Sequence, residues 1–300
     1  MPDSNQPGTG ISKPPLNNIT LFLDLSDHLD EKKWTGNQII GGKYRYQQFI
    51  EITGWLGEEH MTSLKDLGMR VKSYEGEINV RTYPSNEFPN IAKELNRYSI
   101  NKHNFGNCFN KDGTSQITPK LKSGVKRIFD DCRSNPDWKG CDIWGYFGER
   151  TFYKEECNNL IVIYTDGYPF HSDNLAISNS SFLWKTPWKK ELHLLDLPDI
   201  KSKIMSNPDQ YGLKTNTQGL SNLKVLVIGS QAKGKLNNHQ GNLDYHERIL
   251  IRELWRDWLV KMGVKEDNFD MLFMKDCDEN AVRDRLKWFF KSPLKPFTIQ

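Results

Sequence analysis

Runs of apolar residues that end abruptly in polar groups recur along the chain. Residues 19–23 (ITLFL) are almost entirely apolar and lead directly into Asp24, and residues 160–165 (LIVIYT) lead into Asp166 and then Gly167. Short continuous apolar runs are typical of strands that are buried on both faces of a parallel sheet. Strands of this kind are therefore expected at 19–23, 160–165, 223–228 and 270–274.

Between these runs, apolar residues recur at helical spacing. The clearest helix follows the 223–228 strand: Asp244 is its expected N-cap, Glu247 completes a capping box, and Gly263 ends it. Its apolar stripe consists of Leu250, Ile251, Leu254, Trp255, Trp258 and Leu259. Further helices are expected within 31–66, at 90–98, from 118 to 132, around 198–206 and from 279 to 290.

Two segments on either side of Glu75-Gly76-Glu77 have strand-like composition. These segments, 69–74 and 78–83, predict an antiparallel hairpin or one bent strand pair at the edge of the sheet. The alternation of strands and helices predicts a three-layer α/β/α sandwich around a doubly wound, mostly parallel sheet with one antiparallel edge strand.

The elements form one expected domain, residues 18–300, with an insertion at about 168–220. Residues 1–17 are rich in Pro, Gly, Asn and Ser, which predicts a flexible N-terminal tail. No internal repeat or low-complexity linker divides the domain.

Charge and cysteine usage narrow the classes of function. The 300 residues carry 41 basic and 38 acidic side chains, a net charge of +3, which gives no support for binding nucleic acid or an anionic membrane. No stretch approaches the ~20 apolar residues of a membrane span. Five cysteines without a C-x-x-C pair favour a reduced protein without a disulfide framework. Because the N-terminus also lacks the apolar core of a leader peptide, we expect a cytoplasmic protein.

Asp24 and Asp166 each follow a buried strand. If those two strands are neighbours across the switch point of a doubly wound sheet, Asp24, Ser26 and Asp166 meet at its carboxyl edge. The loop that contains Thr114 and Ser115 precedes a helix and could bring another hydroxyl group to this edge. Two carboxylates with hydroxyl groups suit Mg²⁺ or Mn²⁺, and Ca²⁺ less well.

The order of these motifs resembles the von Willebrand factor A domains over about residues 18–290. The metal-ion-dependent adhesion site of that family has Asp-x-Ser-x-Ser after the first strand, a threonine in a later loop, and Asp-Gly after the fourth strand. The matching segments here are Asp24-Leu25-Ser26-Asp27-His28, Gly113-Thr114-Ser115 and Thr165-Asp166-Gly167. The resemblance implies a divalent-cation site formed by Asp24, Ser26, either Thr114 or Ser115, and Asp166, with His28 in place of the family's last serine.

The resemblance also implies a protein-interaction module whose cation, Mg²⁺ or else Mn²⁺ or Ca²⁺, binds a Glu or Asp of a partner protein. One alternative is a Mg²⁺-dependent phosphoryl hydrolase or nuclease that uses the same crevice, and another is a metal-free scaffold with a vestigial site. The spacing reveals no nucleophile with its base, which favours a function without catalysis. Residues 229–235 match the GxxxxGK of a phosphate-binding loop, but Leu236 replaces the required Ser or Thr, so we expect no nucleotide there.

Overall fold

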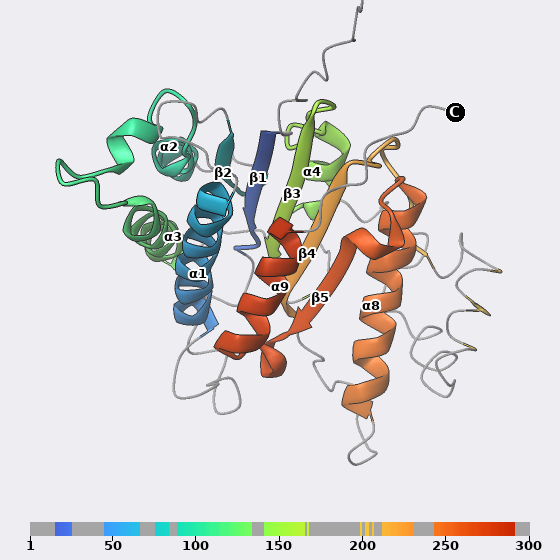
Figure 1. The fold of residues 1–300 in the computed structure, drawn as a ribbon. Coiled ribbons are helices and arrows are strands. Elements are labelled where there is room, and N and C mark those ends of the chain that lie inside the picture. The colour runs from blue at the N-terminus through green and yellow to red at the C-terminus, as the bar shows by residue number, and fades with distance from the viewer. Residues whose placement is uncertain are drawn as a thin grey trace, which may run out of the picture.

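The computed structural model describes residues 16–25, 45–66, 76–83, 89–133, 141–165, 167, 199, 202–203, 206, 212–230 and 243–291. Its centre is a five-stranded sheet in the order β2-β1-β3-β4-β5, and every neighbouring pair is parallel (Figure 1). The strands are β1 (Leu16–Leu23), β2 (Glu77–Arg81), β3 (Cys157–Tyr164), β4 (Leu223–Ser230) and β5 (Phe269–Phe273). The predicted α/β fold is confirmed.

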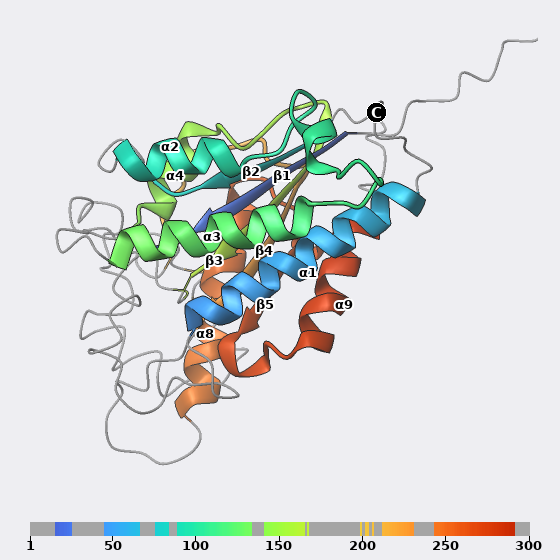
Figure 2. The same ribbon diagram turned by 90° about the vertical axis from the view of Figure 1, so that its left-hand side faces the viewer.

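Helices cover both faces of the sheet. They are α1 (Arg45–Asp66), α2 (Pro89–Tyr98), α3 (Ile117–Arg133), α4 (Ile143–Glu149), α8 (Leu243–Lys261) and α9 (Glu279–Lys291). Three short 3-10 turns lie at Phe105–Cys108, Glu266–Asn268 and Met274–Asp276. Figure 2 shows α3, α1 and α9 side by side on one face. On the other face, the rings of Phe147 in α4 and Trp258 in α8 are 5.0 Å apart.

Apolar side chains fill the space between the layers, as the sequence pattern predicts. All eight residues of β4 are buried, and so is the entire predicted stripe of α8. The helix expected from 279 begins as predicted, because the Asp278 carboxylate accepts a hydrogen bond from the Ala281 amide at 2.9 Å. Among the described residues, no helix combines the length and apolar character needed to cross a membrane.

The predicted antiparallel edge strand is not seen in the part of the chain that the structure describes. Edge strand β2 runs parallel to β1, and residues 69–74 of the expected hairpin lie outside the described residues. Within β2, Ile78 and Val80 are buried, whereas Glu77, Asn79 and Arg81 are partly exposed. An edge strand that is open on one face alternates in this way whatever its direction, so the pattern did not reveal its orientation.

Two further segments bear on the predictions. Residues 142–147, whose type the sequence leaves open, contain most of α4, and the Asp142 side chain caps this helix by accepting from the Gly145 amide at 2.8 Å. The insertion predicted at about 168–220 lies mostly outside the described residues.

Candidate site at the carboxyl edge of the sheet

Strands β1 and β3 lie side by side and end together. Leu23 pairs with Tyr164, and the Asp24 amide donates a hydrogen bond to the Tyr164 carbonyl oxygen at 2.9 Å. Strand β2 lies beyond β1, whereas β4 and β5 lie beyond β3, so the strand order reverses between β1 and β3. Open α/β sheets bind ligands at such a reversal, on the carboxyl side. The prediction that these two strands are neighbours is confirmed.

Asp24 is only 4% exposed and lies in a chain of hydrogen bonds. The Thr165 hydroxyl donates to Asp24 Oδ2 at 2.6 Å and accepts from the Gly167 amide at 3.1 Å. The carbonyl oxygen of Gly167 in turn accepts from the indole Nε1 of Trp255 in α8, at 2.9 Å. The network therefore joins the tips of β1 and β3 to a core tryptophan, and it uses Asp24 as an acceptor, which suits an ionised carboxylate.

Cys141 approaches Asp24 from the side of β2. Its Sγ accepts from the Leu25 amide at 3.1 Å, donates to the Leu23 carbonyl oxygen at 3.3 Å, and lies 2.9 Å from the Thr82 hydroxyl. Burial, and to a smaller extent the negative charge of Asp24, hold the pKa of this thiol well above its usual value. The thiol therefore stays protonated and acts as a donor. The sequence contains no pattern that would have drawn attention to Cys141.

Thr114 and Ser115 do not join this site, and the expectation that one of them reaches the carboxyl edge is not met. The segment before them pairs with the beginning of β2, where Ile100 and Ile78 exchange backbone hydrogen bonds of 2.7 and 2.8 Å. Ser115 forms an isolated bridge with Phe109, and its hydroxyl accepts from the first amide of α3 at 3.3 Å. These hydroxyl groups therefore lie near the amino edge.

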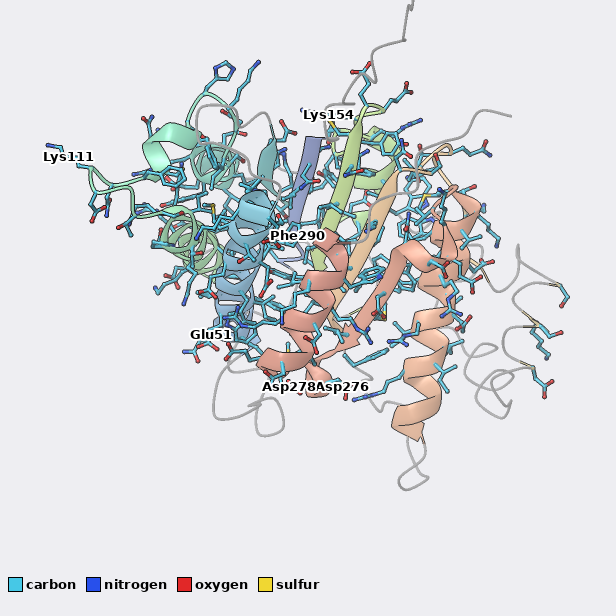
Figure 3. The ribbon with its side chains drawn as sticks, viewed as in Figure 1. Glu51, Lys111, Lys154, Asp276, Asp278 and Phe290 are labelled. Atoms are coloured by element: carbon cyan, nitrogen blue, oxygen red, sulfur yellow. The ribbon has the colours of Figure 1, made fainter. Side chains whose placement is uncertain are left out.

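The direction of α3 supports this placement. Near its start, the Thr118 hydroxyl lies 3.5 Å from the Gly54 carbonyl oxygen in the middle of α1, whereas near its end Phe129 stacks on Phe49 in the first turns of α1, at 6.2 Å. Because α1 begins near the carboxyl edge, where Phe49 stacks on Tyr164 at the end of β3, α3 starts toward the amino edge and runs alongside α1 (Figure 2). In Figure 3, Lys111 and Lys154 lie at the upper end, and Asp276 and Asp278, which follow β5, lie at the opposite end.

The described residues supply part of a possible cation site. Ser26, His28 and Asp166 lie outside the described residues, although both chain neighbours of Asp166 belong to the hydrogen-bond network of Asp24. Within the described ranges, no group of three or more His, Cys, Asp and Glu side chains is placed to hold a metal ion. A carboxylate beside a hydroxyl group has the oxygen chemistry that Mg²⁺ and Mn²⁺ require, whereas the protonated thiol of Cys141 is a poor metal ligand.

In comparisons with known proteins, no family model matches this chain, and no curated protein matches its sequence. The function is therefore inferred from the site itself. The phosphate-loop resemblance at 229–235 follows β4 as the sequence predicts, but residues 231–242 lie outside the described residues and α8 begins at Leu243. The expectation that this loop binds no nucleotide stays a prediction.

Proposed function

We propose that this domain binds a divalent cation, Mg²⁺ or Mn²⁺, between the tips of β1 and β3 and uses it to hold a Glu or Asp of a partner protein. The observation that carries the proposal is the position of Asp24. A carboxylate that is almost completely buried stands at the point where the strand order reverses, within hydrogen-bond contact of the neighbouring strand tip. Buried carboxylates are usually paired with cations or coordinate metals.

In this proposal Asp24 supplies the central carboxylate, and Asp166, Ser26 and His28 are the additional ligands to test. Thr165 orients the Asp24 carboxylate through its hydrogen bond to Oδ2. Thr114 and Ser115 are not included, because their loop lies toward the other edge of the sheet. A carboxylate of the partner would complete the coordination shell, so partner binding would depend on the metal.

A metal-free scaffold is the second candidate, and the same hydrogen bond favours it. Because Oδ2 of Asp24 already accepts from Thr165 at 2.6 Å, the carboxylate could serve only to fasten β1 to β3. On this alternative, partner binding would use another surface and would not respond to chelators.

Calorimetric titration with MgCl₂ and MnCl₂ distinguishes the two candidates. We expect the wild-type protein to bind one cation and Asp24→Asn to lose at least tenfold in affinity while remaining folded by circular dichroism. The matched control is the double variant Thr114→Ala/Ser115→Ala, which removes the two hydroxyl groups of the loop before α3. It should bind the cation as the wild type does. Absence of binding in the wild type would reject the metal-dependent function, and loss of binding in the control would reject the ligand set proposed here.

A further inference from the structure

We propose that Cys141 is a positioning residue that fixes the Asp24 carboxylate in the orientation needed for the cation. This inference rests on the proposed metal-dependent function and adds to it a residue from a different part of the chain. Cys141 does not contact the cation in this scheme. It acts on the backbone on either side of Asp24.

The contacts of Cys141 flank a single residue. Its Sγ accepts from the amide of Leu25, the residue after Asp24, at 3.1 Å, and it donates to the carbonyl oxygen of Leu23, the residue before, at 3.3 Å. Leu23 and Leu25 are both fully buried, so water cannot replace either hydrogen bond. A side chain that bridges these two groups restricts the backbone torsions of Asp24 and therefore the direction of its side chain.

Cys141 is itself held in place from the side of β2. Its Sγ lies 2.9 Å from the hydroxyl of Thr82, which is buried directly after β2. The next residue, Asp142, donates its amide to the Tyr83 carbonyl oxygen at 2.8 Å. Asp24 is thus held from both neighbouring strands: through Cys141 on the β2 side, and through Thr165 on the β3 side.

A second buried cysteine offers a comparison. Cys132 lies in α3 and is as buried as Cys141, but among the described residues it makes no hydrogen bond to β1. Removing its sulfur therefore removes similar packing without touching the backbone around Asp24. The two positions separate a loss of core packing from a loss of positioning.

The experiment uses Cys141→Ala, Cys141→Ser and Cys132→Ala in the full-length chain, with Mn²⁺ affinity measured by calorimetry. Cys141→Ala should weaken Mn²⁺ binding about tenfold or more, the usual effect of removing a group that orients a metal ligand. Cys141→Ser keeps one donor and one acceptor in the same place, so its affinity should stay within about threefold of wild type. Cys132→Ala should bind Mn²⁺ as wild type does.

Hydrogen exchange at the Leu25 amide, followed by NMR, is the second readout and needs no metal. This amide should exchange faster in Cys141→Ala and stay protected in Cys141→Ser and Cys132→Ala, because only the first variant removes its acceptor.

If the wild type binds Mn²⁺ and Cys141→Ala binds it equally well, the positioning role is wrong and the proposed function stands. If the wild type binds no Mn²⁺, the proposed function fails, and the positioning role fails with it. Unchanged exchange at Leu25 in Cys141→Ala would reject the positioning role in either case.

Discussion

His60 should make the stability of this domain strongly dependent on pH. The residue lies in α1, is fully buried, and has its ring 5.7 Å from that of Phe290 in α9. Burial lowers the pKa of its imidazole from 6.5 to about 4, because the charged form would lose its hydration inside the core. The neutral form is therefore the one that the folded protein accommodates.

The pKa difference sets the magnitude and the sign of the effect. Between about pH 4 and 6.5 the unfolded chain binds a proton at His60 and the folded chain does not, so stability falls as the pH is lowered through this range. Each unit of pKa difference corresponds to about 1.4 kcal/mol, so the protonation of His60 changes the free energy of unfolding by on the order of 3 kcal/mol. This stability is fully present above pH 6.5 and is lost near pH 4. That is a large share of the total stability of a typical domain, about 5–15 kcal/mol.

Urea unfolding of wild type and His60→Gln from pH 7.5 to 4.5 measures this contribution. Carboxylates titrate in both proteins, so the difference between the two free energies of unfolding isolates the histidine. We expect that difference to shift by about 2.5 kcal/mol across the range, in favour of the variant at acid pH. His103→Gln, at an exposed position, is the control and should follow the wild type. Parallel curves for wild type and His60→Gln would refute the reasoning.

Two other substitutions test local features of the fold by the same unfolding assay. Gly167 has φ +92°, and a Cβ atom there would lie 2.8 Å from the Ser230 hydroxyl, so Gly167→Ala should cost about 2 kcal/mol or more. Gly219→Ala, at φ +75° with no atom within 4 Å of the new Cβ, carries only the conformational cost of about 1 kcal/mol, and equal losses at the two glycines would contradict the steric argument. Asp278→Ala should lower stability by about 1 kcal/mol by removing the cap of α9, and no loss would show that the cap is dispensable.

The sequence predicted the central strands well because their burial is nearly continuous. In the pairs Leu23–Tyr164 and Tyr164–Ile228, apolar side chains meet across β1, β3 and β4. Strands buried on both faces leave a signature that depends on no distant residue. The rules of doubly wound sheets then make these three strands neighbours. The same rules place Asp24, which follows β1, at the carboxyl edge.

The placement of Thr114 and Ser115 could not be predicted in the same way. Which edge of the sheet a loop occupies depends on how many times the chain crosses the sheet before it. The helix expected at 90–98 is present as α2, but the strand before it runs parallel to β1 and not in the expected hairpin, so α2 returns to the amino edge before α3 begins. The loop that contains Thr114 and Ser115 therefore lies at the opposite edge of the sheet from Asp24, although in the family that it resembles the corresponding residues share one metal site.

The surroundings of Asp24 could not be predicted from the sequence either, because they come from Thr82, Cys141 and Thr165, which are brought together only by folding.

Those surroundings make the stability of Asp24→Asn informative in the absence of metal. Asparagine keeps an acceptor for the Thr165 hydroxyl and removes the charge, so the change isolates what the buried charge itself contributes. If the charge serves to bind a cation, it destabilises the metal-free protein. Asp24→Asn should then be at least as stable as the wild type without metal, and its stability should not increase when metal is added. A charge kept to fasten β1 to β3 strengthens the hydrogen bond, and Asp24→Asn should then be about 1–3 kcal/mol less stable. Urea unfolding with EDTA and with MgCl₂ therefore measures which of the two proposed functions the carboxylate serves, and we expect the first result.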